Sequence, residues 1–237
     1  MIFIDGTFIR PPNYLQTIII MYIDILTGLK IPGIYALFSN KTQQDYDIFF
    51  EYIHNLIDLD NCDILTVTID FEEALLNSTI KYFDKKRILG CYFHFKYSLY
   101  RAANKYKLTT KEYKSTTLNL INNYLGILPF EKIENTNSFN KIIEDINNKF
   151  KEPYSDYLNY FKKEWKKFYL NEILYYNINE KNISTNNFLE NYNGQIKKIL
   201  NGKKLLNWSE YMSFLLNEDK RFKYKLSNYK TKNKYEK

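Results

Sequence analysis

The sequence predicts an α/β protein whose mixed, five-stranded sheet is flanked by helices. Short apolar runs rich in β-branched residues follow one another at the N-terminus, and strand and helix patterns then alternate. Helical periodicity dominates from residue 95 onward. With 237 residues, of which 45% are hydrophobic, the chain can bury a substantial core.

The first part of the chain is expected to run in the order β-β-β-α-β-α-β. Strands are predicted near 1–9, 15–24, 31–39, 63–70 and 88–94, and helices near 42–58 and 71–83. This order is that of the ribonuclease-H-like fold, in which the first strands pair antiparallel and the remainder are parallel.

The part from 95 to 183 reads as helical throughout and is predicted to be an all-α insertion. Its helices are expected near 95–106, 110–125, 137–150 and 154–176. Helices near 186–201 and 207–217 would complete a core made of residues 1–94 and 184–217, the last helix being buried through Trp208, Met212 and Leu215. Residues 218–237 carry a net charge of +5 and are expected to form a flexible basic tail.

Charge is distributed unevenly along the chain. Residues 1–94 contain seven Lys and Arg against twelve Asp and Glu, a net charge of −5, whereas residues 95–237 carry +12. An acidic part joined to a basic part suits a protein that holds divalent metal in one place and a phosphate backbone in another. Solvated helix faces are the alternative explanation for any single basic stretch.

Two aspartates stand at strand positions where a charge needs a partner or a metal. Asp5 interrupts the apolar run that opens the chain, and Asp70 ends the β-branched run before a helical segment. The carboxyl end of a strand is a common place for a functional site in α/β sheets. For Asp70 the alternative is structural, because an Asp before a helix with Glu73 three residues later resembles a capping box.

Glu190 lies on the polar side of a predicted amphipathic helix. The apolar face of that helix is formed by Leu189, Tyr192, Ile196 and Ile199. The side that carries Glu190 also carries Asn186, Asn193, Gly194 and Lys197, and the glycine would let a ligand approach the backbone. A solvated glutamate is the alternative.

Together these segments resemble the Mutator-like (MULE) transposase domain. The resemblance begins with the Asp-Gly-Thr-Phe step at Asp5–Phe8 and ends with the segment that contains Glu190. The similar segments run in the family's order and are residues 4–8, 14–16, 31–37, 70–74, 90–94, 160–165 and 185–190. One departure is Tyr176-Asn177, where the family usually has Trp-Asn.

The resemblance implies a DNA transposase that uses Asp5, Asp70 and Glu190 as catalytic, metal-binding residues. Two Mg²⁺ or Mn²⁺ ions would be held with Asp5 between them, Asp70 completing one site and Glu190 the other. Water would cleave a DNA strand at an element's end, and the freed 3′-hydroxyl would attack target DNA. The 120 residues between Asp70 and Glu190 fit a helical insertion.

DNA, both element ends and target, is the expected partner. The candidate DNA-binding residues are Cys91, His94, Asn186, Asn187, Asn193 and Lys197. Family members carry a DNA-binding module ahead of the catalytic domain, whereas this chain begins at the first strand. A truncated or domesticated derivative is therefore expected, either as a homo-oligomer or with a separate DNA-binding partner.

Cysteine and histidine leave a weaker alternative open. Cys62 and Cys91 are too few for a disulfide framework. Cys91-x-x-His94 could supply half of a zinc site, with Cys62 and His54 as remote partners, but this spacing alone is weak evidence for zinc. The resemblance implies instead that Cys91 and His94 end strand five near the carboxylates, where His94 would contact a phosphate or a displaced nucleotide.

Two other functions remain open. A catalytically silent, domesticated DNA-binding or regulatory protein would keep the fold without needing metal, and a ribonuclease-H-like nuclease would need the acids but no strand transfer. The sequence contains no apolar stretch long enough for a membrane helix and no evident cleavable signal. An intracellular location is expected, nuclear in a eukaryote and cytoplasmic otherwise.

Overall fold

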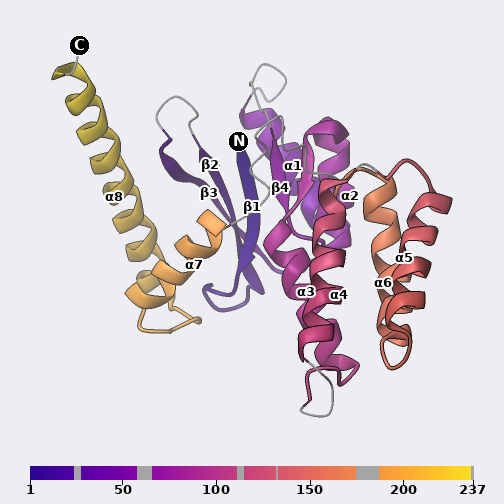
Figure 1. Ribbon diagram of the computed structural model, residues 1–237. Coiled ribbons are helices and arrows are strands. Elements are labelled where there is room, and N and C mark those ends of the chain that lie inside the picture. The colour runs from indigo at the N-terminus through magenta and orange to yellow at the C-terminus, as the bar shows by residue number, and fades with distance from the viewer. Residues whose placement is uncertain (24–27, 58–65, 111–114, 132, 175–186, 236–237) are drawn as a thin grey trace. The chain divides into compact units, whose positions relative to one another are not determined.

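The computed structural model describes residues 1–23, 28–57, 66–110, 115–131, 133–174 and 187–235 (Figure 1). The chain divides into two compact units. The first joins Met1–Phe83 to Asn187–Lys237, and the second is Asp84–Asn186. The predicted core and insertion were divided at residues 94 and 184, so the observed boundary on the N-terminal side comes earlier.

A five-stranded mixed sheet is present, as predicted. Its strands are β1 (Ile2–Thr7), β2 (Gln16–Ile23), β3 (Lys30–Phe38), β4 (Val67–Ile69) and β5 (Ile88–Gly90). The strand order is β3-β2-β1-β4-β5, with antiparallel pairing of β1 to β2 and of β2 to β3, and parallel pairing of β1 to β4. The first three strands need only short connections, whereas the connection from β3 to β4 includes a helix and brings β4 back parallel to β1.

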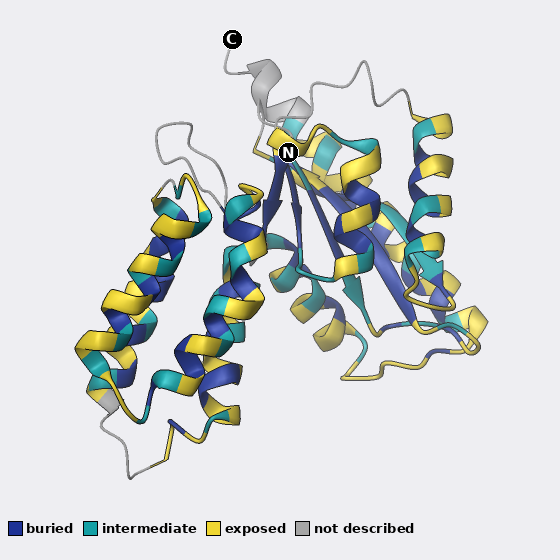
Figure 2. Cartoon of the chain, turned by 90° about the vertical axis from the view of Figure 1, so that its right-hand side faces the viewer, coloured by how far each residue is buried: buried dark blue, intermediate teal, exposed yellow. Residues whose placement is uncertain are grey.

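The middle strands are covered on both faces. Every residue of β2 except Tyr22 is buried, and Phe3 and Ile4 of β1 are fully buried. Figure 2 shows the strands largely in the buried colour, whereas the helices alternate between buried and exposed sides. A strand covered on both faces is apolar along its whole length, which explains the continuous run Ile18–Met21.

The helices after β3 follow their predicted spans. Helix α1 (Gln43–Leu56) begins with a capping box between Thr42 and Asp45, and α2 (Glu73–Tyr82) follows β4. The buried face of α1 consists of Tyr46, Phe49, Phe50 and Ile53. Phe38 contacts this face, with ring centroids 5.0 Å from Tyr46 and 5.3 Å from Phe49.

The second unit is helical apart from β5. Its elements after the short η1 (Lys85–Arg87) and β5 are α3 (Tyr92–Lys105), α4 (Ser115–Ile127), η2 (Leu128–Phe130), α5 (Thr136–Phe150) and α6 (Ser155–Leu170). Aromatic rings fill its core. The ring centroids of Phe95 and Trp165 are 4.9 Å apart, and those of Phe139 and Tyr169 are 5.2 Å apart. This agrees with the all-helical pattern of the sequence.

Strand five is shorter than predicted. It ends at Gly90, Cys91 caps α3, and His94 lies in the first turn of that helix. The apolar residues after Gly90 fit either a strand or the buried face of a helix, and periodicity alone does not separate these two in a short run.

The C-terminal part also differs from the prediction. Helix α7 (Asn187–Ile199) agrees with it, but α8 runs from Trp208 to Tyr235, so the expectation that the helix ends near 217 before a flexible tail is wrong. Glu218 and Phe222, both in the predicted tail, are buried. The apolar residues of this segment continue the spacing of a helix, and this spacing was a better guide to its structure than its high charge, which had suggested a flexible tail.

The predicted buried face of α8 is wrong as well. Trp208 and Met212 are each 49% exposed, whereas Tyr211 and Phe214 are buried.

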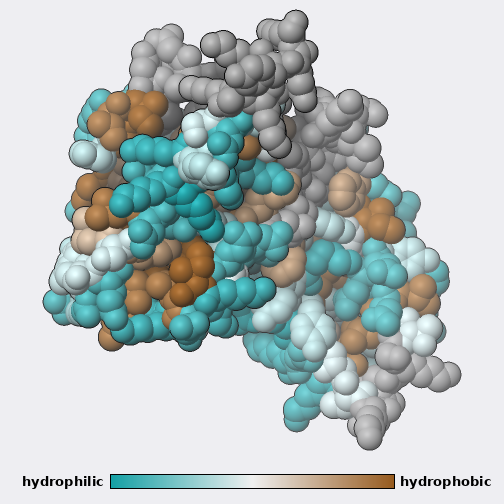
Figure 3. All heavy atoms as spheres, turned by 90° about the vertical axis from the view of Figure 1, so that its left-hand side faces the viewer, coloured by the Kyte–Doolittle hydropathy of each residue, from teal (hydrophilic) through white to brown (hydrophobic). Residues whose placement is uncertain are grey.

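Figure 3 shows one face of the molecule, on which groups of apolar side chains lie between hydrophilic ones. Within the described residues, no helix combines the length and apolar character that crossing a bilayer requires.

Candidate functional site

Asp5 lies inside the sheet, on the central strand β1. Only 8% of the Asp5 surface is exposed to solvent. One of its carboxylate oxygens, Oδ1, accepts a hydrogen bond of 2.8 Å from the backbone N–H of Gly6. Burying a carboxylate in a sheet is costly unless its charge is compensated. The position is therefore unusual for a residue with a purely structural role.

Asp70 follows the parallel neighbour of that strand. The register pairs Ile2 with Val67 and Phe3 with Thr68, an offset of 65 residues, which is also the separation of Asp5 and Asp70. Because the strands are parallel, this register places both aspartates toward the carboxyl ends of two neighbouring strands, on the same side of the sheet's end. Asp70 is not the N-cap of α2, which is Glu72, but its Oδ1 accepts a 3.0 Å hydrogen bond from the Glu72 N–H.

Glu190 comes from α7, more than a hundred residues further along the chain. Helix α7 is fixed to β1 by an edge-to-face contact between Phe188 and Phe3, whose ring centroids are 6.1 Å apart. The ammonium of Lys30 lies 3.3 Å from the centroid of the same Phe188 ring. The predicted apolar residues Leu189, Tyr192 and Ile196 are buried, whereas Ile199 is exposed.

The electrostatics of Asp5 connect all three acids. The pKa of the Asp5 carboxyl is raised to about 7, mainly by burial, with further contributions in the same direction from the charge of Asp70 and, to a smaller extent, that of Glu190. The hydrogen bond from Gly6 and the charge of Lys41 partly oppose this rise. The pKa of Glu190 is also raised to about 7, by burial. Asp5 therefore interacts electrostatically with both other predicted acids, Asp70 and Glu190, and we refer to these three residues as the carboxylate cluster.

A polar network that the sequence did not indicate borders this cluster. Lys41 Nζ lies 3.2 Å from Glu72 Oε2, and Tyr46 donates a 2.9 Å hydrogen bond to the other oxygen of Glu72. Gln16 in turn donates to the Tyr46 hydroxyl over 3.2 Å. Lys41 lies in the short link between β3 and α1 and belongs to no recognisable motif. No pattern in the sequence therefore marks it as part of a site.

Gly6 explains how this network comes so close to β1. A Cβ atom at this position would lie 2.6 Å from Oε1 of the buried Gln16 side chain. The absence of a side chain therefore lets Gln16 lie against the strand beside Asp5.

The candidate DNA-binding residues fall in different places. Cys91 is buried and His94 half-buried in α3 of the second unit, where Cys91 Sγ and a His94 ring nitrogen lie within 4.8 Å of each other. Asn187 begins α7 but its side chain is outside the described part. Asn186, Cys62 and the Tyr176-Asn177 pair lie outside the described residues.

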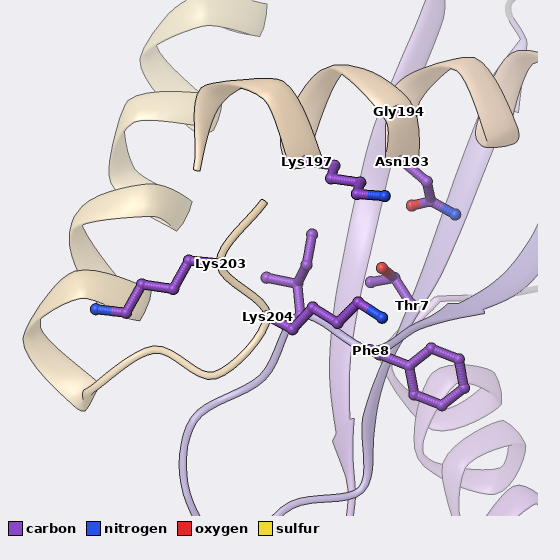
Figure 4. Close-up of a pocket in the computed structure, with 8 residues that line it drawn as sticks. Thr7, Phe8, Asn193, Gly194, Lys197, Lys203 and Lys204 are labelled. Carbon is purple, nitrogen blue, oxygen red and sulfur yellow. The ribbon is translucent and has the colours of Figure 1, made fainter. Parts of the chain in front are cut away.

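Asn193 and Lys197 do come together, in a hollow beside α7 (Figure 4). Its volume is about 220 Å³, and it lies between α7, the segment after β1 and the loop that follows α7. The other residues of its walls are Thr7, Phe8, Ile9, Gly194, Lys203 and Lys204. Gly194 has open space where a Cβ would be, so the predicted approach to the helix backbone is available.

Comparison with known proteins does not assign the chain to a group. The sequence matches no protein-family model, and a search of curated proteins finds no similar sequence.

Proposed function

We propose that this chain is the catalytic domain of a ribonuclease-H-like DDE transposase, similar to the Mutator-like group, that cleaves and joins DNA strands. Asp5, Asp70 and Glu190 would hold two Mg²⁺ or Mn²⁺ ions. The observation that carries the proposal is that two strands which pair in parallel, and a helix from a distant part of the chain, supply three carboxylates to one cluster.

The sheet supports the ribonuclease-H-like assignment. Its order β3-β2-β1-β4-β5, with an antiparallel β1-β2-β3 part and β4 parallel to β1, is the order of that fold. Asp5 lies in β1, and Asp70 directly follows β4, the strand that pairs with β1 in parallel. The helical second unit, Asp84–Asn186, lies in the sequence between Asp70 and Glu190, where the proposal requires an insertion.

The residues present fit a hard divalent cation. All three side chains offer carboxylate oxygens, the ligands that Mg²⁺ and Mn²⁺ prefer. Two of the carboxyls have a pKa near 7 because they are buried, so a cation can replace their protons at neutral pH. When bound, such ions would lower the pKa of water and stabilise charge on the phosphate oxygens.

The protein's own groups have separate tasks in this reaction. The Gly6 and Glu72 amides each hold one oxygen of Asp5 or Asp70 in place. Lys41, whose charge acts on Asp5, offsets part of the negative charge of the cluster and offers a donor to a phosphate. Glu190 would supply the third carboxylate from α7, outside the sheet.

The test is nicking of supercoiled plasmid by the full chain in Mg²⁺ or Mn²⁺, followed by joining of a 3′-hydroxyl oligonucleotide to that plasmid. Asp5→Asn, Asp70→Asn and Glu190→Gln should each abolish nicking. Asp219→Asn, which removes an exposed carboxylate on α8, should leave it unchanged. Nicking that survives Asp5→Asn would overturn the proposal, and nicking without joining would favour a nuclease.

A silent DNA-binding protein is the second candidate, favoured by the basic hollow of Figure 4, which needs no metal. In that case the wild-type chain would bind DNA but nick it no faster than Asp5→Asn does, and Glu190→Gln would bind DNA as tightly as the wild type.

A further inference from the structure

An exposed aromatic ring stands between two lysines just after β1. Phe8 is 56% exposed, and the ammonium groups of Lys41 and Lys204 lie 5.8 and 5.9 Å from its ring centroid. A large apolar ring at the surface costs solvation free energy, and flanking cations are typical of surfaces that stack on a nucleobase. Figure 4 shows the Phe8 ring and the Lys204 side chain at one end of the hollow.

The backbone that carries these side chains is well connected. Arg10 and Leu205 form a parallel bridge, in which the Arg10 N–H donates to Lys204 O over 2.9 Å and the Leu206 N–H donates to Arg10 O over 3.0 Å. Helix α7 leads into this segment through a left-handed turn at Asn201 and Gly202. Phe8 and Lys204 are therefore presented by two segments that are hydrogen-bonded to each other.

The turn itself is a Schellman motif. The Gly202 N–H donates to Lys197 O over 2.7 Å, and the Asn201 N–H donates to Lys198 O over 3.1 Å. This motif ends α7 directly before the two lysines at 203 and 204, so the end of the helix and the basic loop are fixed together.

The charges at this surface are available to an anion. Within the described part of the chain, Lys197, Lys204 and Arg10 form no ion pair, whereas Lys203 is paired with Glu210 at 2.6 Å. A second, adjoining hollow shares Phe8 and Lys204 with the first and adds Arg10, so the basic surface continues beyond one binding position. An extended row of cations suits a repeating phosphate backbone better than a single small anion.

A polar atom in the wall of the hollow also lacks a partner. The Oδ1 atom of Asn193 is buried and, among the described residues, accepts no hydrogen bond. Figure 4 shows the Asn193 side chain pointing from α7 toward the space between Lys197 and Thr7. A buried acceptor left in this state costs free energy that a donor on a bound molecule would recover.

We propose that this hollow binds one nucleotide of a single DNA strand, with the base stacked on Phe8 and the adjoining phosphates on Lys197 and Lys204. Asn193 Oδ1 would accept a hydrogen bond from an N–H of the base. A single strand is required because a base exposes its face only when it is unpaired and unstacked. The volume of about 220 Å³ is below the usual range for whole small-molecule ligands, which suits one base-sized group.

This inference rests on the proposed function for the choice of DNA, and it extends that function by naming how the strand is held. Phe8 follows Asp5 by three residues, and Lys41 acts on both Phe8 and Asp5. A strand held at Phe8 would therefore reach the carboxylate cluster within a short distance along β1.

The experiment measures binding of a labelled oligothymidine strand to the full chain by fluorescence anisotropy, with EDTA present so that no cleavage takes place. Phe8→Ala should weaken binding about tenfold or more, and Phe8→Trp should restore it. Tyr224→Ala is the matched control, because Tyr224 is 68% exposed beside Lys223 and Lys225 on α8. The control should bind as the wild type does.

Two further readouts separate the base from the phosphates. On a strand of the same length without bases, Phe8→Ala should bind as tightly as the wild type. Lys204→Ala should weaken binding to both strands and reduce the slope of log K against log salt by about 0.7, the value for one phosphate contact on a single strand. The proposal is overturned if Phe8→Ala has no larger effect than Tyr224→Ala, or weakens binding to both strands equally.

Failure of this proposal can be told apart from failure of the proposed function. Asp5→Asn removes a carboxylate of the cluster and should not weaken DNA binding in EDTA, whereas Phe8→Ala, which weakens DNA binding, should leave the affinity of the protein for Mn²⁺ unchanged. Circular dichroism should give both Phe8 variants the melting temperature of the wild type, since an exposed ring adds little to the core.

Discussion

Asp70 continues the parallel register that joins β1 to β4, so its carboxylate comes beside that of Asp5, and its charge raises the pKa of the Asp5 carboxyl. Two like charges close together at the ends of neighbouring strands, one of them buried, oppose folding unless a proton or a cation is bound. This relationship makes the stability of the protein sensitive to both pH and divalent metal.

Stability should fall as pH rises when no divalent cation is present. The folded-state pKa of Asp5 is about 7 against 3.8 for the ordinary carboxyl, so the folded state binds more protons between these values. The free energy of unfolding therefore decreases from about pH 4 to about pH 7 and levels off above, by up to about 4 kcal/mol from Asp5. Urea unfolding at several pH values measures this decrease.

The same titration in Asp5→Asn isolates the contribution of Asp5. The variant should lose the part of the pH dependence between 4 and 7 that comes from Asp5, while the part from Glu190 remains, and it should be more stable than the wild type at pH 8. Asp219→Asn should follow the wild-type curve. An Asp5→Asn curve parallel to that of the wild type would mean that Asp5 ionises normally in the folded protein.

Adding Mg²⁺ or Mn²⁺ should reverse the loss of stability at high pH. At a concentration about a hundredfold above the dissociation constant, binding to the folded state alone adds about 2.7 kcal/mol, or roughly 5 to 10 °C in melting temperature for a chain of this size. The increase should be larger at pH 8 than at pH 5.5, where protons compete for the carboxylates.

Differential scanning fluorimetry of the wild type and of Glu190→Gln checks this metal effect. Glu190→Gln should reduce the increase in melting temperature, whereas Asp219→Asn should leave it unchanged. Equal increases in all three proteins would place the metal elsewhere.

The start of the segment expected to be a flexible tail should contribute to stability. Glu218 is buried, accepts a 2.6 Å hydrogen bond from Tyr192, and pairs with Arg221 at 2.8 Å. Glu218→Ala leaves the Tyr192 hydroxyl without this partner and should cost about 1–3 kcal/mol in chemical unfolding.

Its neighbour on the same helix provides the comparison. Asp219 is exposed and pairs with Lys223 one turn away, so Asp219→Ala should change the unfolding free energy by no more than about 0.5 kcal/mol. Similar losses for the two variants would contradict the anchoring of α8 through Glu218.

Replacing Thr68 by valine should not destabilise the protein. Thr68 in β4 is fully buried, and its hydroxyl has no hydrogen-bond partner among the residues that the structure describes. Valine has the same shape without the hydroxyl, so Thr68→Val should be neutral or stabilising by about 1 kcal/mol. Thr68→Ser, which keeps the hydroxyl but loses a buried methyl group, should be destabilising, and thermal unfolding separates the two.

Local patterns in the sequence were enough to predict most elements. The buried face of α1, the fully apolar β2 and the helices of the second unit each follow from periodicity, because each buries its own apolar residues. Where the pattern was ambiguous the prediction was wrong: residues after Gly90 form a helix and not a strand, and α8 buries Tyr211 and Phe214 in place of Trp208 and Met212.

The candidate site divides in the same way. Asp5, Asp70 and Glu190 could be named from the sequence because the resemblance to the Mutator-like domain joined three local signals. Taken alone, Asp70 and Glu190 each had a structural alternative. Phe8, Lys41 and Lys204 could not be named in this way, because each is an ordinary surface residue until the fold brings them together.

The sequence by itself therefore determined the kinds of elements, the mixed sheet and the three acidic candidates, since these depend on residues close together in the chain. Only the tertiary structure decided that the parallel register brings Asp5 beside Asp70, that α7 returns to β1 through Phe188, and that a basic hollow forms next to Phe8. The physical reason is that burial and charge–charge interactions depend on distances in space, and contacts between residues far apart in the chain are set only when the whole core packs.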